Sequence, residues 1–190
     1  LLDAALPYLT YLTPFTYGIN SDGTLLPPSD EWLLAAAGQY RTASLMHLST
    51  LTEDGRFDSS RSTLVLESAD AQDALVQSVL DTVQAKHYFG LDVDFEYVLP
   101  EQREAYAAFV ARLRDALGMV GCPVIAALAP KTSAAQRGLL YEAHDYALLG
   151  AAADAVFLMT YEWGYTYGPP MAVAPLPQVR AVLDYAVSVI

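Results

Sequence analysis

The sequence lacks features that define several common classes of protein. It contains one cysteine in 190 residues, so no disulfide can form within the chain. No apolar run reaches the roughly 18 residues that a membrane-spanning helix needs. Lysine and arginine number 10 against 22 acidic residues, which gives a formal net charge of -12. Because so acidic a chain repels phosphates, we exclude nucleic acids and anionic membrane surfaces as partners.

Other absences narrow the fold and the organisation of the chain. Neither GxGxxG nor GxxxxGK[ST] follows a predicted strand, so a nucleotide-binding fold has no support. The first residue is Leu1 and no charged segment precedes an apolar one, so no signal peptide is visible and we expect an excerpt of a longer protein. The chain is 54% hydrophobic and 17% charged, which is typical of one globular domain with a sizeable core.

Strand and helix patterns alternate along the chain. The predicted strands are rich in Val, Ile, Leu, Tyr and Phe, and they are Pro7–Tyr17, Ser44–Thr50, Gly90–Val98, Pro123–Ala129 and Ala155–Tyr161. The predicted helices are Asp30–Gln39, with Asp30 as a candidate N-cap, Ala71–Lys86, Glu101–Leu117, Ala134–Leu149 and Pro177–Val189. This alternation predicts an α/β fold with a parallel sheet, either an open doubly wound sheet or a barrel.

Three acids interrupt the predicted strand GLDVDFEYV at residues 90–98. Side chains alternate between the faces of a strand, so Asp92, Asp94 and Glu96 share one face. In a barrel they would point inward and rise toward the C-terminal mouth, where barrel enzymes place catalytic residues. Carboxylates about 6.6 Å apart along a strand resist ionising together, so we expect one of them to hold its proton at neutral pH. A protonated carboxyl in such a place is a candidate general acid.

Two other interpretations of these acids stay open at this stage. An exposed edge strand would alternate polar and apolar residues in the same way, although acids are poor strand formers. Three carboxylates could also hold Mg²⁺ or Ca²⁺, although no pair of histidines and no second acid cluster accompanies them.

Several quoted segments resemble glycoside hydrolase family 18, the chitinase-like family. FGLDVDFEY is similar to the family's strand-4 motif D-G-x-D-x-D-x-E. The segments MTYEWGYTYGPPMAVAP, LAPKTSA and PYLTYLTPFTYGINSDGTL resemble a subgroup of bacterial spore and cell-wall N-acetylglucosaminidases, often attached to LysM modules. The resemblance covers nearly the whole chain. Phe89 stands where the motif has its first Asp, and we expect catalysis to survive because that position starts the strand, far from the sugar.

The resemblance implies a substrate-assisted retaining mechanism without cofactor or metal. It assigns Glu96 as the acid that protonates the glycosidic oxygen and later activates water. Asp94 would orient the 2-acetamido group of the substrate, which attacks the anomeric carbon. Asp92 would share a proton with Asp94. Tyr161 would donate a hydrogen bond to the acetamido carbonyl oxygen.

The resemblance also suggests substrate contacts, each with a plainer alternative. Met159 is either a pocket floor or core packing, and Glu162 is either a substrate contact or a loop cap. Tyr17 ends a predicted strand and is a candidate cleft residue. Aromatic side chains stack on sugar rings, so a loop after the fifth strand is a candidate subsite wall or simply a packed loop; its aromatic residues are Trp163, Tyr165 and Tyr167.

The remaining basic candidates have weaker signals. His47, His87 and His144 have no partner at a metal-binding or catalytic spacing, so we interpret them as structural or solvated. Lys131, in the APKTS segment, is either a substrate contact or a plain loop cation.

By this resemblance, residues 1–190 form part of a (β/α)8 TIM barrel, roughly strands 2–6 and the helix after strand 6. Strands 1, 7 and 8 would be missing, so we expect open sheet edges and poor folding or activity of the isolated piece. The expected substrate is a β-1,4-linked N-acetylglucosamine glycan, peptidoglycan first and chitin second, at a cell wall, a spore surface or outside the cell. The alternatives are an inactive, lectin-like carbohydrate-binding relative and a structural protein of the cell wall or spore coat.

Overall fold

A parallel five-stranded sheet organises the molecule. The computed structural model describes residues 2–164 and 167–190. The strands lie in the order β1-β4-β5-β6-β7, and each neighbouring pair is parallel. They are β1 (Tyr11–Leu12), β4 (Ala43–Ser49), β5 (Gly90–Asp94), β6 (Val124–Leu128) and β7 (Ala155–Leu158). Their spatial order never reverses, so the sheet winds in one direction, as a barrel wall does and a doubly wound sheet does not.

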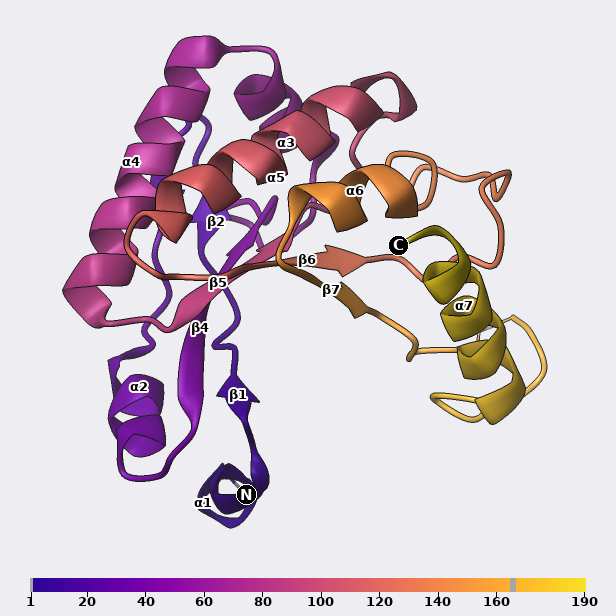
Figure 1. Ribbon diagram of the computed structural model, residues 1–190, viewed down its shortest axis with the longest axis horizontal. Coiled ribbons are helices and arrows are strands. Elements are labelled where there is room, and N and C mark those ends of the chain that lie inside the picture. The colour runs from indigo at the N-terminus through magenta and orange to yellow at the C-terminus, as the bar shows by residue number, and fades with distance from the viewer. Residues whose placement is uncertain (1, 165–166) are drawn as a thin grey trace.

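Helices connect the strands and cover the outer face of this curled sheet (Figure 1). In Figure 1, α3 to α6 lie along one side of the sheet, α2 lies beside β4, and α7 follows β7. The bounds are α1 (Leu2–Ala5), α2 (Glu31–Gly38), α3 (Ser59–Leu66), α4 (Ala69–Lys86), α5 (Arg103–Gly118), α6 (Tyr146–Ala152) and α7 (Leu176–Val189). Two single 3₁₀ turns, Leu6–Tyr8 and Pro100–Gln102, and a small antiparallel hairpin, β2 (Gly18–Ile19) with β3 (Leu25–Leu26), complete the described elements.

The core lies between β5 and the helices that follow β4 and β5. Leu91 and Val93 of β5 and the following Phe95 are fully buried. The Phe95 ring stacks on Tyr106 of α5 at a centroid distance of 5.6 Å and lies 5.8 Å from Phe109. The apolar face of β5 therefore meets the helices, as predicted, and its acids point into the barrel.

The predicted strand Pro7–Tyr17 is wrong over most of its length. Only Tyr11–Leu12 joins the sheet, and Tyr17 makes an isolated parallel bridge to Leu48. Pro7 and Pro14 lack the backbone donor that a strand ladder needs, so this apolar run cannot pair continuously.

The predicted helix Ala134–Leu149 is also largely wrong. The helix here, α6, begins at Tyr146 and is capped by Asp145, whose carboxylate accepts the backbone N–H of Leu148 at 3.0 Å. Gly138 has φ 126°, a conformation that no helix contains, so the chain before Tyr146 runs as turns.

Asp30 precedes α2, but its side chain does not cap that helix. The carboxylate accepts hydrogen bonds from Lys86 at the end of α4 and from Tyr88 instead.

The helix α3 and the β2–β3 hairpin were not predicted. The segment of α3, SSRSTLVL, has a weak apolar pattern, and its start is marked only by Asp58, which accepts the N–H of Ser60 at 2.8 Å.

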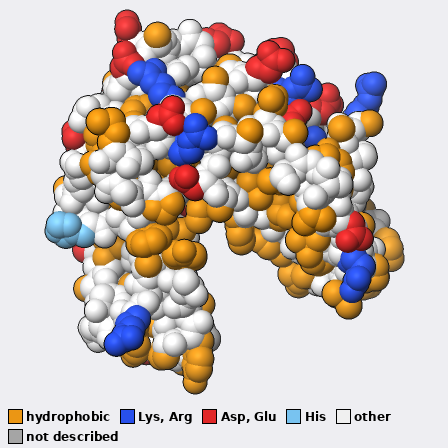
Figure 2. Space-filling model, in the orientation of Figure 1, with side chains coloured by type: hydrophobic (Ala, Val, Ile, Leu, Met, Phe, Trp, Pro, Cys, Tyr) orange, Lys and Arg blue, Asp and Glu red, His pale blue; other side chains and the backbone are white. Residues whose placement is uncertain are grey.

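Apolar side chains gather around a hollow beneath the sheet, as Figure 2 shows. Tyr11 on β1 is 46% exposed and Phe157 on β7 is 47% exposed, so both outer strands present apolar surface. The poor folding or activity expected of the isolated piece stays a prediction.

None of the described helices combines the length and the apolar character needed to cross a membrane.

Candidate active site

The acid row lies in the middle of the sheet. β5 pairs with β4 on one side and β6 on the other, so the edge-strand interpretation is wrong. Asp92 and Asp94 occupy the inner face of β5 and are 8% and 5% exposed. Glu96 lies just beyond the end of the strand and is partly exposed. The three carboxyl groups thus rise from the interior toward the C-terminal mouth.

Burial and nearby negative charges raise the pKa values of two acids of the row, Glu96 and Asp92. Burial raises the pKa of Glu96 to about 7, with the charges of Asp94 and Glu162 adding to the effect. Burial also raises the pKa of Asp92 to about 6, and Asp94 contributes in the same direction. Within the described part of the chain, one oxygen of Asp92 and one of Asp94 have no hydrogen-bond partner. Glu96 is therefore a carboxyl that holds its proton near neutral pH, above two carboxyl groups with free acceptor positions.

A cavity of about 670 Å³ opens over the end of the row. Its wall brings together six of the eight residues predicted for the site: Asp94, Glu96, Met159, Tyr161, Glu162 and Trp163. Asp92 lies deeper, below Asp94 on the same face. The volume suits a sugar-sized ligand or several.

Sharp turns carry the chain over the cavity rim at two strand ends. Tyr97 follows Glu96, and Glu162 follows Tyr161. Tyr97 and Glu162 each have φ 57°, which is uncommon for residues other than glycine.

Burial raises the pKa of Tyr161, and the nearby carboxylates raise it further, so its hydroxyl keeps its proton. Tyr161 can therefore act as a hydrogen-bond donor at the cavity wall.

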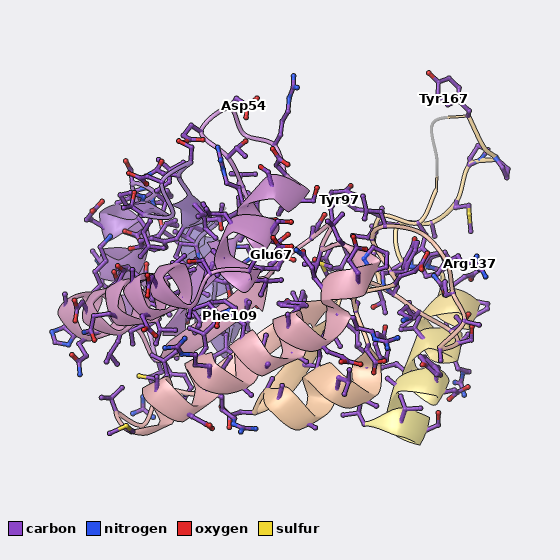
Figure 3. All side chains as sticks on the ribbon, turned by 90° about the horizontal axis from the view of Figure 1, so that it is seen from above. Asp54, Glu67, Tyr97, Phe109, Arg137 and Tyr167 are labelled. Atoms are coloured by element: carbon purple, nitrogen blue, oxygen red, sulfur yellow. The ribbon has the colours of Figure 1, made fainter. Side chains whose placement is uncertain are left out.

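Sequence reasoning missed one wall of the cavity. Phe15, Phe57 and Tyr97 line it from three separate segments. The ring centroids of Phe15 and Phe57 are 6.4 Å apart, and those of Phe57 and Tyr97 are 6.5 Å apart. Figure 3 labels Tyr97 near the centre of the molecule. These rings are distant in the sequence and follow no shared motif, so only the fold brings them together.

Tyr17 was predicted to face the cleft, and this is wrong. Its side chain is 2% exposed and is absent from the cavity wall. The Tyr17 hydroxyl donates to Asp30 at 3.3 Å, and Lys86 lies 5.4 Å from the centre of the ring. Tyr17 therefore belongs to the helix-side packing.

Lys131 and His144 form a buried support and not a substrate contact. Lys131 is 3% exposed and donates to the carbonyl oxygen of His144 at 3.0 Å. The ring of His144 accepts the N–H of Ala129 at 2.8 Å and lies 3.0 Å from the carbonyl oxygen of Phe95. The structural interpretation of His144 is confirmed, and the idea that Lys131 touches substrate is wrong.

The predicted aromatic loop divides into parts with different positions. Trp163 is half-buried at the cavity, and its backbone N–H donates to the carbonyl oxygen of Val173 at 3.0 Å. Tyr167 is 87% exposed at the tip of a projecting loop, as Figure 3 shows. Tyr165 lies outside the described residues.

His47 was interpreted as structural or solvated, yet it faces the acid row. It pairs with Asp92 in the β4–β5 register, and its Nε2 lies 3.5 Å from an oxygen of Asp94. One feature of the sequence could have indicated this: His47 lies on the strand that precedes the acidic strand, two residues before the end of that strand.

Among the described residues, no group of three His, Cys, Asp or Glu side chains is arranged to hold a metal ion.

The chain is similar to one known family and to several known proteins. Residues 37–187 match the model of the family described as Glycosyl hydrolases family 18. The cortical fragment-lytic enzyme of Bacillus subtilis (strain 168) is 39% identical over 184 residues, which are 97% of this chain and 42% of that protein. The protein of the same name from Bacillus cereus is 38% identical over 183 residues, 96% of this chain and 42% of its own. The chain thus spans less than half the length of these curated relatives.

Solved structures agree with the barrel interpretation. The spore cortex-lytic enzyme SleL of Bacillus cereus has a TM-score of 0.93 at 36% identity, over 100% of this chain and 43% of its own. A chitinase from Chromobacterium violaceum has a TM-score of 0.90 at 22% identity, over 100% of this chain and 60% of its own. The second likeness concerns the fold alone. Together they confirm the predicted fold class, a partial TIM barrel.

Proposed function

The chain belongs to glycosyl hydrolases family 18, and from this premise we propose that it carries the catalytic acids of a glycosidase acting on cell-wall glycans. The proposed reaction is hydrolysis of β-1,4-linked N-acetylglucosamine with retention of configuration. No nucleophile from the protein takes part, because the 2-acetamido group of the substrate attacks its own anomeric carbon.

The observation that carries this proposal is the position of the Glu96 carboxyl group together with its raised pKa. Its carboxyl group faces the cavity, and burial raises its pKa to about 7. A general acid works best when its pKa lies near the working pH, because it then holds a proton and releases it readily. In the proposed reaction Glu96 protonates the oxygen of the leaving sugar, and its carboxylate then takes a proton from the attacking water.

The groups around Glu96 suit the acetamido group. Asp94 lies two residues before Glu96, deeper at the cavity wall. Its carboxylate would accept a hydrogen bond from the acetamido N–H, which orients the acetamido carbonyl oxygen toward the anomeric carbon. Asp92 is beneath it, and with a pKa of about 6 it can share a proton with Asp94. The hydroxyl of Tyr161, also at the wall, would donate to the acetamido oxygen. Met159 and Trp163 supply apolar contact for the sugar ring.

We propose peptidoglycan as the substrate and chitin as the second choice within the same chemistry. The names of the relatives, a cortical fragment-lytic enzyme and a spore cortex-lytic enzyme, favour a bacterial wall glycan and a location in the spore or cell wall. LysM modules elsewhere in the full-length protein would fit such a substrate.

The test compares the full-length protein with its Glu96→Gln variant on purified peptidoglycan and on chitin oligomers. Mass spectrometry identifies the sugar at each new reducing end. We expect N-acetylglucosamine ends from the parent and a loss of about 10²- to 10⁴-fold in rate with Glu96→Gln. Glu104→Gln, at an exposed position on α5, is the matched control and should keep the parent rate.

Two results would contradict the proposal. If the parent binds the glycan and releases nothing, the chain is a lectin-like relative or a structural wall protein. If Glu96→Gln keeps the parent rate, the acid lies elsewhere.

A further inference from the structure

His47 is placed against the acid row by the pairing of β4 with β5. It stands opposite Asp92 in the register, and its side chain is buried on the inner face. The Nε2 atom lies 3.5 Å from Oδ2 of Asp94, a distance for electrostatic attraction and not for a strong hydrogen bond. The other oxygen of Asp94 has no partner among the described residues.

The second ring nitrogen of His47 has an adaptable partner. Oγ1 of Thr16 lies 2.5 Å from Nδ1 of His47 and 3.0 Å from Oγ of Ser49. A hydroxyl has one proton and two lone pairs, so Thr16 can donate to a bare Nδ1 or accept from a protonated one. In the second state its own proton turns to Ser49. Thr16 can therefore bond Nδ1 in either case, while Nε2 faces Asp94.

The groups facing His47 are acidic or uncharged. Asp92 and Asp94 face it from β5, Glu96 lies beyond them, and the Phe15 ring covers it at a centroid distance of 5.0 Å. Thr16 contacts the His47 ring, and Ser49 contacts Thr16. No lysine or arginine stands among the cavity-lining residues that the structure describes.

Resting on the proposed function, we propose that His47 is a positioning residue for this reaction: its imidazole holds the Asp94 carboxylate toward β4 and supplies the positive charge that balances the acid row. Asp94 then keeps one oxygen free for the substrate. The charge also sets the pH above which Glu96 has lost the proton that it must donate.

The direction of this second effect follows from electrostatics. A positive charge favours the ionised form of a neighbouring carboxyl and so lowers its pKa. His47 acts in this way on both Glu96 and Asp92, against the raising effect of burial. Replacing His47 by a neutral residue therefore raises the pKa of Glu96, and the general acid stays protonated to higher pH.

The experiment measures kcat/KM against pH for the full-length parent and its His47→Gln variant on chitin oligomers and peptidoglycan. The alkaline limb of this profile reports the acid of the free enzyme. We expect the limb to move up by about half a pH unit to one unit. His144→Gln is the matched control, because both nitrogens of that buried ring contact backbone groups and not the acid row. It should lower the melting temperature and leave the limb in place.

A second measurement is independent of turnover. The carboxyl ¹³C signal of Glu96, assigned by its loss in Glu96→Gln, is titrated in the parent and in His47→Gln. If neither the kinetic limb nor this titration moves while His47→Gln loses stability as His144→Gln does, the proposal for His47 is overturned. If the parent hydrolyses neither glycan but the Glu96 titration moves up, the proposed function fails and the charge role of His47 stands.

Discussion

Two regions of this molecule bury carboxylates, and they do so in opposite ways. On the helix side of the sheet, Asp30 is 1% exposed and accepts hydrogen bonds from Lys86, Tyr88 and Tyr17. Burial would raise the pKa of Asp30, but the bonds from Lys86 and Tyr88 outweigh it and hold the pKa below its ordinary value. This carboxylate is ionised, and both of its oxygens accept hydrogen bonds.

On the barrel side the acids have few partners. Asp92 and Asp94 are nearly as buried as Asp30, yet each has an oxygen without a hydrogen-bond partner among the described residues. The pKa of Asp92 rises to about 6 and that of Glu96 to about 7, because burial dominates and the charges repel one another. Burial alone therefore does not distinguish the candidate catalytic acids from Asp30. The open acceptor positions of Asp92 and Asp94 do.

The largest expected effect separates the two regions by stability. Asp30→Asn removes the charge that balances Lys86, whose ammonium stays partly buried at the same place. Breaking a buried ion pair on one side costs about 3–5 kcal/mol of unfolding free energy. Urea unfolding of the full-length protein measures it. A loss below about 1 kcal/mol, the usual contribution of a surface ion pair, would show that the cluster of Asp30, Lys86, Tyr88 and Tyr17 does not stabilise the fold as a buried ion pair does.

The cluster also has a pH signature with a definite sign. The pKa of folded Asp30 is below its unfolded value, so its stabilisation is present above the unfolded pKa and is lost as pH falls through the folded pKa. Asp30→Asn should therefore cost most at neutral pH and least in acid.

The same substitution at the acid row should have the opposite sign. Asp92 has a folded pKa of about 6, above its ordinary value of about 3.9, so ionising it in the fold is unfavourable. The cost grows from about pH 4 and is complete above about pH 6. Asp92→Asn removes it, and we expect a gain of about 1–3 kcal/mol at pH 8 that disappears near pH 4.

Urea unfolding at both pH values checks this expectation. A loss of stability at pH 8, equal to that of Asp30→Asn, would mean that Asp92 is held by contacts as Asp30 is, and the contrast between the two regions would fail.

The sequence predicted the acid row well because strand alternation is local. Asp92, Asp94 and Glu96 are two residues apart, so one short segment determines that they share a face, and the match to the family motif adds roles. The alternation of strands and helices likewise predicted the parallel sheet. The segment around Tyr161 and Glu162 was predicted from the resemblance; it reaches the cavity after the end of β7, which lies two strands from β5 in the same parallel sheet.

What depends on distant contacts could not be predicted. His47 meets Asp94 only through the register of β4 and β5. Tyr17 has the composition of a cleft residue, but its direction is decided by Asp30 and Lys86, which belong to other segments. The extent of the first strand was misjudged because composition outweighed the two prolines in it.

The smallest expected effect concerns the exposed neighbour of Glu96. The charge of Glu162 raises the pKa of Glu96, after burial and the charge of Asp94. Glu162→Gln removes that charge, so the pKa of Glu96 falls and the alkaline limb of kcat/KM moves down by about half a pH unit. The shift is opposite in sign to the one expected for His47→Gln. Glu162 is exposed, so added salt screens its charge, and the difference between parent and variant should shrink toward zero in about 1 M salt. A limb that does not move at low salt would leave burial and Asp94 as the causes of the raised pKa, and Glu162 would then act on the substrate and not on the acid.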